Sequence, residues 1–176
     1  MPQRRPLAPL DPAQLEALAL AYVERYATST SKLRRYLQRK RRERGFSGAF
    51  EPALDTILSK MIGLGYVNDG LFAEMRTRGL RAKGYGDRRI AQALHADGIS
   101  GEESAAARAD DDPLAAAHRF AQRRRFGPYA ATPPSDDQMR RQLAAMARAG
   151  HGFTIAQQVL RGSRLDDQAD ALDDAS

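Results

Sequence analysis

The sequence predicts an all-α fold made of three tandem three-helix repeats, each helix-turn-helix-like. Three times, two apolar residues spaced four apart precede a glycine, a bulky apolar residue and a hydroxyl residue, which predicts a helix that ends in a turn. The glycines of the three copies lie 53 and 54 residues apart, and no segment alternates like a strand. The copies are Leu33 and Leu37 with Gly45-Phe46-Ser47, Ile90 and Leu94 with Gly98-Ile99-Ser100, and Met139 and Leu143 with Gly152-Phe153-Thr154.

The first repeat is expected over residues 11–67, behind a flexible N-terminus of residues 1–10. Its first helix begins at Asp11-Pro12, because aspartate is a favoured N-cap and proline is tolerated at the first helical position. Hydroxyl residues at 29–31 cap the second helix and Pro52 opens the third, and both helices end at glycines. The predicted helices are 11–28, 31–44 and 52–64.

The second repeat is expected over residues 68–111. Asn68-Asp69 caps its first helix, which breaks at Gly84-Tyr85-Gly86, and Asp87 caps the next. The last helix of this repeat is an alanine-rich segment with little apolar bulk, and its pattern is the weakest in the chain. The predicted helices are 68–83, 87–97 and 102–109.

The third repeat is expected over residues 112–161, followed by an acidic tail of residues 162–176 that we expect to be disordered. Asp112-Pro113 repeats the start seen in the first repeat. A loop rich in glycine and proline follows the first helix, and Ser135 begins the second. The predicted helices are 112–125, one from 135 that includes Met146, and one capped by Thr154 that runs to 161.

Each repeat alone is too small to bury much apolar surface. We therefore expect neighbouring repeats to stack into an elongated, curved molecule, as other short helical repeats do. An elongated shape suits binding along a polymer. We expect the protein to be a monomer.

Charge is unevenly distributed along the chain. The net charge is +6, and residues 162–176 contribute −4 because they carry five aspartates and one arginine, which leaves +10 for residues 1–161. A basic body suggests a polyanionic partner such as nucleic acid, an acidic protein surface or an anionic membrane. Coding bias toward arginine is an alternative source of the total charge, but it does not explain a regular placement.

Composition excludes several classes of function. The absence of cysteine excludes disulfides, thiolate metal sites and cysteine nucleophiles. No apolar run approaches the roughly 20 residues that span a bilayer, and the N-terminal residues lead into no signal-like apolar stretch. We therefore expect a cytoplasmic protein that does not contact the membrane.

Catalytic patterns are also missing. The histidines at 95, 118 and 151 lie in separate segments without metal-ligand spacing, and we expect them at the surface or its boundary. Asp110-Asp111-Asp112 precedes a proline and is typical of a solvated cap, and Gly84-Tyr85-Gly86 lacks the strand and lysine of a phosphate loop. We expect no enzymatic activity and no cofactor.

Paired arginines recur in or at the start of the second helix of every repeat. Helical geometry projects these positions beside and opposite the apolar stripe, so they face solvent. Their recurrence favours a contact surface over an ordinary solvated helix face, and further cations cluster nearby. The candidate binding residues are Arg34, Arg35, Arg39, Lys40, Arg81, Lys83, Arg88, Arg89, Arg123, Arg124, Arg140 and Arg141.

Two other functions remain open at this point. An independent helix-turn-helix DNA-binding regulator would read base edges, whereas the candidate helices offer mainly arginine, which suits phosphates and acidic side chains. A structural adaptor would bind neither DNA nor a protein filament. Tyrosine and phenylalanine residues mostly occupy core or post-glycine positions and are expected to pack, with Tyr36, Tyr85 and Tyr129 as exceptions that could stack on single strands.

One stretch resembles the signature of the RecX family, regulators of the RecA recombinase. The resemblance covers roughly residues 15–161, and its central part is fairly specific in order and spacing. The flanking repeats also match, through Ser31-Lys32-Leu33 with Leu37 and through Gly152-Phe153 with Ile155 and Val159. The central residues are Leu64-Gly65-Tyr66-Val67-Asn68-Asp69, Phe72-Ala73, Arg78, Lys83-Gly84, Arg89-Ile90, Leu94 and Gly98-Ile99.

The resemblance implies a tandem three-helix-repeat protein that binds in the groove of the RecA filament on single- or double-stranded DNA, independently of sequence. It further implies inhibition of recombination and of the SOS response, by limiting filament growth or activity. The chain departs from the family pattern at Asn68, where an acidic residue is common, in the basic segment from Gln38 to Arg44, and in the proline-rich loop of the third repeat. The acidic tail lies outside the resemblance.

Overall fold

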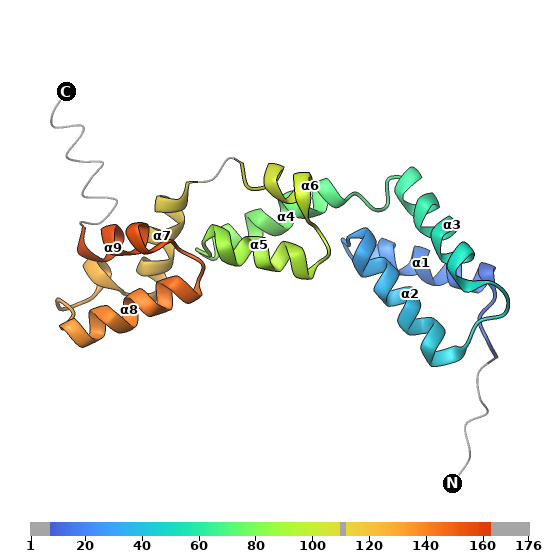
Figure 1. The fold of residues 1–176 in the computed structure, drawn as a ribbon, viewed down its shortest axis with the longest axis horizontal. Helices are drawn as coiled ribbons and strands as arrows, with labels where there is room; N and C mark the ends of the chain where they lie inside the picture. The colour runs from blue at the N-terminus through green and yellow to red at the C-terminus, as the bar shows by residue number, and fades with distance from the viewer. Residues whose placement is uncertain (1–7, 110–111, 163–176) are drawn as a thin grey trace, which may run out of the picture. The chain divides into compact units, whose positions relative to one another are not determined.

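The computed structural model describes residues 8–109 and 112–162, and over these ranges the chain forms nine α-helices and one 3-10 helix (Figure 1). No strand occurs within the described ranges, where the β-type pairing is an isolated bridge between Leu10 and Phe46. The predicted all-α fold is confirmed. The elements are α1 (Pro12–Arg25), α2 (Thr30–Arg44), α3 (Phe50–Gly63), α4 (Asp69–Ala82), α5 (Asp87–Ala96), α6 (Gly101–Ala106), α7 (Pro113–Arg124), η1 (Gly127–Tyr129), α8 (Asp136–Arg148) and α9 (Phe153–Arg161).

The chain divides into two compact units. Unit 1 contains residues up to Phe72 together with Asp97–Glu103, and unit 2 contains Ala73–Ala96 together with the chain from Ser104. The predicted second repeat is therefore shared between the units. The predicted repeat boundaries and the predicted elongated, curved shape stay predictions.

Some sequence predictions concern residues outside the described ranges. These residues include 1–7 of the N-terminal segment, Asp110 and Asp111, and the acidic tail beyond Gly162. The predicted flexibility of the N-terminus and disorder of the tail stay predictions.

Unit 1 is built around α1, α2 and α3. Their apolar residues recur at helical spacing, so each helix turns one stripe toward the others. Leu33 and Leu37, the apolar pair of the first repeat, are fully buried on α2, and each such side chain contributes about 1.5–3 kcal/mol by leaving water. The core residues are Leu10, Leu15, Ala19, Leu33, Leu37, Phe50, Leu54, Ile57, Leu58, Met61 and Val67.

The start of α2 also forms hydrogen bonds and an ion pair with residues of unit 1 that come later in the sequence. Ser29 accepts a hydrogen bond from the Lys32 backbone N–H at 3.2 Å, and its own hydroxyl donates to the Asp97 carbonyl at 2.6 Å. The Thr30 N–H donates to the Asp69 carboxylate at 2.7 Å, and the Lys32 ammonium lies 3.2 Å from Asp97. The start of α2 is therefore bonded both to the beginning of the predicted second repeat, at Asp69, and to Asp97 within it.

Unit 2 has its own core on α7, α8 and α9. Small residues on α7 let the helices approach closely, because alanine fills little space between them. The buried core residues are Ala117, Phe120, Ala121, Met146, Ala149, Ala156, Val159 and Leu160.

Four predicted helix ends are wrong. Helix α6 ends at Ala106 and not at Ala109. Helix α1 ends at Arg25 and not at about Thr28, because the chain must be extended at Tyr26 to bring buried Ser29 to the cap of α2. Helix α3 begins at Phe50 and not at Pro52. The backbone N–H groups of the first helical turn have no carbonyl partner, so proline, which has no N–H, is tolerated at any position of that turn. Helix α9 begins at Phe153 behind Gly152, so Thr154 is not its cap.

Several large apolar side chains at the end of α3 are exposed in unit 1. Ile62, Leu64 and Tyr66 are exposed by 48%, 59% and 50%, although the helical spacing predicts Leu64 on the buried face. Leu64 lies beyond the last turn of α3, so it no longer follows the helical stripe.

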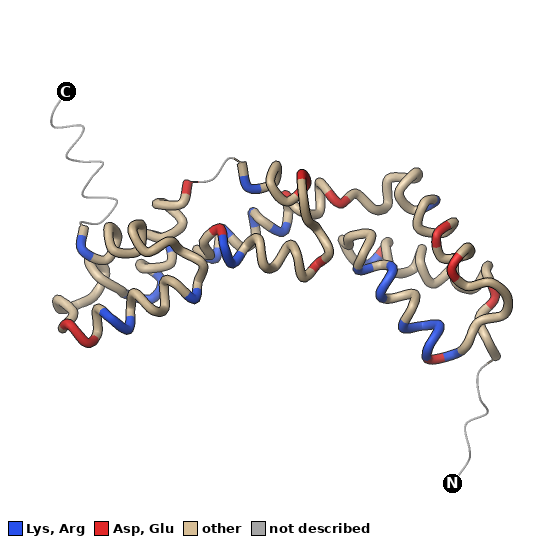
Figure 2. Tube along the Cα trace, viewed as in Figure 1, with Lys and Arg blue, Asp and Glu red and all other residues tan. Residues whose placement is uncertain are grey.

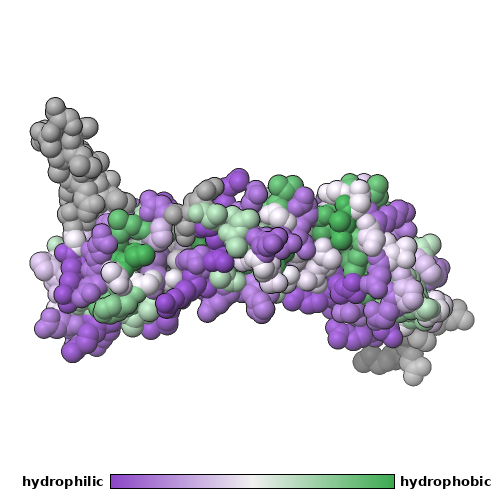
Figure 3. Space-filling model, turned by 45° about the horizontal axis from the view of Figure 1, so that its top comes forward, coloured by the Kyte–Doolittle hydropathy of each residue, from purple (hydrophilic) through white to green (hydrophobic). Residues whose placement is uncertain are grey.

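In the face that Figure 3 presents, hydrophilic residues predominate and hydrophobic ones form small patches. Within the described ranges, every helix is too short or too polar to cross a membrane.

Candidate polyanion-binding site

The twelve predicted binding residues lie at the surface of both units. Arg34, Arg35, Arg39 and Lys40 belong to α2 in unit 1, and the other eight belong to unit 2. None of the twelve is buried. Figure 2 shows basic positions recurring along α2 and acidic positions on the neighbouring α3.

Carboxylates neutralise part of the basic face of α2. The Arg34 guanidinium donates to Asp55 of α3 at 2.7 Å. Arg39 and Lys40 both reach Glu43, at 3.5 and 2.7 Å. The hydrogen bond from Lys40 is the main cause that holds the pKa of Glu43 below its ordinary value, so this carboxylate stays ionised. These cations are engaged within unit 1, although exposed pairs of this kind are weak and exchange partners readily.

A stronger concentration of unpaired positive charge lies on unit 2. Two adjoining hollows of about 350 and 360 Å³ share the lining residues Tyr85, Phe120 and Arg124. No acidic residue of the described ranges lines either hollow. We call the cations that line the two hollows the basic cleft: Lys83, Arg89, Arg123, Arg124 and Arg148.

The basic cleft draws its cations from four places in the sequence. Lys83 follows α4, Arg89 lies in the first turn of α5, Arg123 and Arg124 end α7, and Arg148 ends α8. All five residues are exposed, and no ion pair or side-chain hydrogen bond involves Lys83, Arg89, Arg123 or Arg148 within the described part of the chain.

Close backbone packing brings these segments together. The Gly84-Tyr85-Gly86 turn lies against the turn after α8: Gly86 N–H donates to the Ala149 carbonyl at 2.9 Å, and the buried His151 Nε2 lies 3.0 Å from the Gly84 carbonyl. Gly84 has φ of +77°, and a Cβ there would lie 2.7 Å from the Phe120 nitrogen. Only glycine fits this position. The turn therefore places Lys83 beside the end of α7.

An aromatic ring supports one cation of the basic cleft. The Arg124 guanidinium lies over the Phe120 ring at 5.8 Å from its centroid, and Phe120 packs edge-on against Phe126 at 6.3 Å. A guanidinium over a ring face is held in place while its N–H groups stay available to an anion. The cleft can thus bind phosphates or carboxylates.

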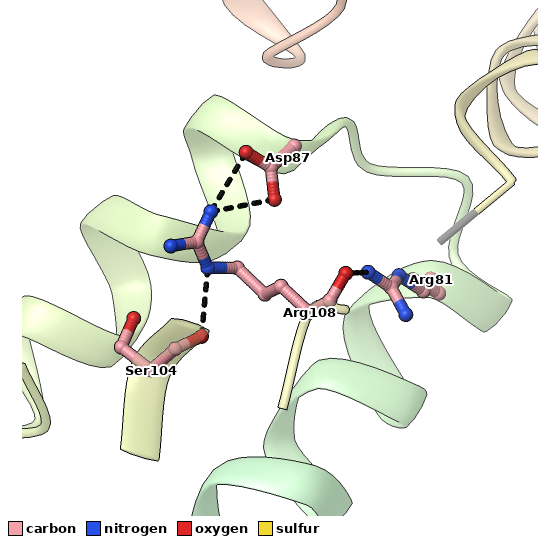
Figure 4. Close-up of polar contacts among 4 residues, drawn as sticks. All are labelled: Arg81, Asp87, Ser104 and Arg108. Carbon is pink, nitrogen blue, oxygen red and sulfur yellow. Dashed lines mark hydrogen bonds and ion pairs between the residues drawn. The ribbon is translucent and has the colours of Figure 1, made fainter. Parts of the chain in front are cut away.

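Arg81 has a different environment from its predicted neighbours. Its guanidinium donates to the Arg108 carbonyl at 3.1 Å, and Arg108 in turn donates to both oxygens of Asp87 at 2.8 Å and to the Ser104 carbonyl at 2.9 Å (Figure 4). This network joins α4, α5 and α6 within unit 2. Its geometry indicates a structural role for Arg81, and the sequence analysis did not single out Arg108.

The arginine doublets do not act as pairs. Arg140 forms an ion pair with Asp137 of its own helix. Arg141 precedes Ala145 by four residues and Arg148 by seven, and both of these residues line a hollow of the basic cleft. Arg141 therefore shares a face of α8 with the basic cleft. In the other doublet of this unit, Arg89 lines a hollow and Arg88 does not.

Arg148 was missed by the sequence analysis. The seven-residue spacing from Arg141 is the signal that could have found it, because residues seven apart lie on the same helical face.

The prediction that the histidines lie at the surface is wrong for two of the three. His118 and His151 are 2% and 3% exposed, while His95 is exposed. His118 Nδ1 lies 2.9 Å from the Tyr129 hydroxyl, and burial lowers its pKa, opposed in part by Asp112. Burial is possible because each imidazole has a hydrogen-bond partner. In the described ranges, no group of histidine and acidic residues is arranged to hold a metal ion.

Comparisons with known proteins agree with one another. A model of the second three-helix domain of RecX matches residues 68–107. Regulatory protein RecX of Myxococcus xanthus (strain DK1622) is 35% identical over 170 residues, which cover 90% of this chain and 91% of that protein. Regulatory protein RecX of Agrobacterium fabrum (strain C58 / ATCC 33970) is 32% identical over 113 residues, which cover 64% of this chain and 61% of that protein.

A solved structure has the same fold. The crystal structure of RecX from Lactobacillus salivarius superposes with a TM-score of 0.69 at 15% identity and covers 85% of this chain and 94% of that one. At this identity the likeness concerns the arrangement of helices alone.

Proposed function

This chain belongs to the RecX family of regulatory proteins, and from that premise we propose that it binds the RecA filament on DNA and limits the growth or activity of that filament. The role is non-enzymatic and is exerted in the cytoplasm, on DNA of any sequence. The predicted residues other than Arg81, extended by Arg148, are the proposed contacts.

The observation that carries this proposal is the basic cleft. Five cations from four segments surround two hollows without an acidic lining residue among the described residues. Gathering like charges is unfavourable in the free protein, and an anionic partner relieves that repulsion. Acidic surface residues of a protein filament and DNA phosphates both supply such charge.

The proposed mechanism is electrostatic docking followed by obstruction. Binding in the filament groove would place a folded unit where a RecA protomer must add or rearrange. No residue of this chain needs to react, because occupancy alone hinders growth. Long-range attraction would speed the encounter and make it depend on salt.

The experiment is a titration of the purified protein into RecA on single-stranded DNA, with ATP hydrolysis and filament length as readouts. We expect both to fall in wild type, and Arg124→Glu to weaken the inhibition at least about tenfold, since reversal removes one charge-assisted contact of about 1.5–3 kcal/mol. Arg124 is the test residue because it lines both hollows.

Arg161→Glu is the matched control. Arg161 is exposed, belongs to the same unit and lines neither hollow. Its substitution therefore makes the same change of charge outside the basic cleft. Equal effects of the two substitutions would contradict a localised site. Tight binding to a single duplex sequence without RecA would contradict the proposed role altogether.

A further inference from the structure

A groove of about 500 Å³ lies along α1 and α2 in unit 1, apart from the basic cleft. Three tyrosines and three cations line it, and no acidic residue of the described ranges does. Its volume is within the range of about 300–1,000 Å³ that is common for small-molecule sites. The lining residues of interest are Tyr22, Tyr26, Tyr36, Arg25, Arg39 and Lys40.

The three tyrosines form one connected aromatic surface. Tyr22 stacks on Tyr36 with ring centroids 4.2 Å apart and an interplanar angle of 21°, and Tyr26 lies 5.2 Å from Tyr22. Tyr22 and Tyr36 are half-buried, but Tyr26 is 49% exposed. The stacked pair thus packs against a third ring, Tyr26, which is the most exposed of the three and can contact another planar group.

The three cations surround the rings. The Arg25 guanidinium lies 5.6 Å from the centroid of Tyr26, and Arg39 and Lys40 lie 5.5 and 5.8 Å from that of Tyr36. Arg39 and Lys40 also contact Glu43, at 3.5 and 2.7 Å. Guanidinium and ammonium groups carry five and three N–H donors, so one carboxylate does not saturate them.

We propose that this groove binds a nucleotide of single-stranded nucleic acid, with its base stacked against Tyr26 and its phosphates bonded by Arg25, Arg39 and Lys40. Aromatic rings interleaved with cations are the chemistry of single-strand platforms. An acidic peptide uses the cations but leaves the exposed ring without a planar partner. In a duplex, the bases are stacked on one another and cannot reach it.

The inference rests on the proposed function and deepens it, because it assigns a direct contact with the DNA strand to unit 1. It differs from the sequence expectation in the residue that stacks. Tyr36 is one of the three tyrosines that the sequence offers for stacking, whereas in the structure Tyr36 is stacked on Tyr22 and the exposed ring of this groove is Tyr26.

The test measures binding to two labelled oligonucleotides of equal length by fluorescence anisotropy, without RecA. One is oligothymidylate and the other is an abasic strand with the same phosphates and no bases. Tyr26→Ala should weaken binding of the thymidylate strand about 5- to 150-fold, the range that corresponds to about 1–3 kcal/mol per stacked base, and leave the abasic strand unchanged. Tyr26→Phe, which keeps the ring, should bind both strands like wild type.

A spectroscopic variant gives an independent readout. The chain contains no tryptophan, so Tyr26→Trp adds a single one in the groove. We expect the thymidylate strand to quench its fluorescence and the abasic strand to leave it unchanged. Equal quenching by both strands would overturn the stacking.

Glu43 provides a test of the phosphate half of the site. Glu43→Gln releases Arg39 and Lys40 and should strengthen binding of both strands. The matched control is Glu51→Gln, because Glu51 is exposed, pairs with Arg41 at 3.5 Å and does not line the groove. If both substitutions strengthen binding equally, net charge alone acts and the phosphate contacts assigned to the groove are overturned.

Other outcomes separate this inference from the proposed function. If Tyr26→Ala weakens inhibition of RecA but does not change the binding of either strand, a protein surface occupies the groove, and the inference fails while the proposed function stands. If Tyr26→Ala lowers affinity for both strands alike, no base is stacked and the inference also fails. If wild type distinguishes the two strands but never affects RecA, the proposed function fails and the groove assignment holds.

Discussion

His118 and His151 are buried imidazoles that link separate segments of unit 2. His118 contacts the Tyr129 hydroxyl that follows the break after α7, and His151 contacts the turn beside Lys83. A buried histidine without a partner would cost about 1–3 kcal/mol, so each of these contacts is required by burial itself. The charge state of His118 then matters for stability.

Protonation of His118 should destabilise the fold. Burial lowers its pKa below the ordinary value of about 6.5, so the unfolded chain binds a proton more readily than the folded one. The free energy of unfolding should therefore be fully retained above about pH 7 and should fall as pH drops through 6.5 toward the lower folded pKa. Urea unfolding at pH 8, 6 and 5 measures this trend.

His118→Gln should remove part of this pH dependence, because glutamine does not titrate. His95→Gln is the control, since His95 is exposed, and it should leave the profile as in wild type. A wild-type stability that does not change between pH 8 and 5 would contradict the role of His118.

At the scale of elements, some helices begin at a residue whose side chain caps them, and others begin without a side-chain cap. Asp11 and Ser135 form complete capping boxes with Gln14 and Gln138, and the sequence predicts these starts correctly. Helices α3 and α9 begin behind Ala49 and Gly152, without a side-chain cap. The sequence carries no capping signal at these positions, so these starts could not be predicted; α3 begins at the buried Phe50, whereas Phe153 at the start of α9 is exposed.

Ser29 and Ser135 allow the two functions of a cap to be separated. Ser29 caps α2 and also donates to the Asp97 carbonyl, whereas Ser135 is an exposed cap without a long-range bond. Ser135→Ala should cost about 0.5–1 kcal/mol and Ser29→Ala about 2–3 kcal/mol, because the second also leaves a carbonyl without its partner. Thermal or urea unfolding of both variants measures the difference, and equal costs would show that the Asp97 bond adds nothing.

Asn68 shows that a departure from the family pattern need not change an element. Its side-chain oxygen accepts a hydrogen bond from the Leu71 N–H at 2.9 Å at the start of α4. An amide oxygen and a carboxylate oxygen both serve as N-caps, so the cap survives the replacement.

At the scale of the whole molecule, most cations of the basic cleft could be predicted from the sequence, but their proximity to one another could not. Lys83, Arg89, Arg123 and Arg124 stand out in the sequence by charge. Their meeting depends on packing between segments more than 30 residues apart, around a glycine turn whose role only the structure reveals. Charge repetition alone does not distinguish them from Arg81, which bonds the Arg108 carbonyl.

Net charge should tune the affinity for nucleic acid. Residues 163–176 carry five aspartates and Arg164, so deleting them changes the net charge from +6 to +10. We expect the shortened chain to bind single-stranded DNA more tightly at 50 mM salt and equally at 1 M, where the screening length is only about 3 Å. Anisotropy titrations across this salt range test the expectation, and an unchanged affinity at 50 mM would exclude an electrostatic influence of these residues.

The bonds at the start of α2 have a consequence for dissecting the protein. Unit 1 is not one uninterrupted stretch of sequence, because residues 97–103 return to it after the chain has entered unit 2. A fragment that stops at Phe72 keeps Ser29 and Lys32 but lacks Asp97, which both of them contact. Neither unit can be excised at a single peptide bond, so truncations designed from the repeat pattern would remove native hydrogen bonds along with the segment they delete.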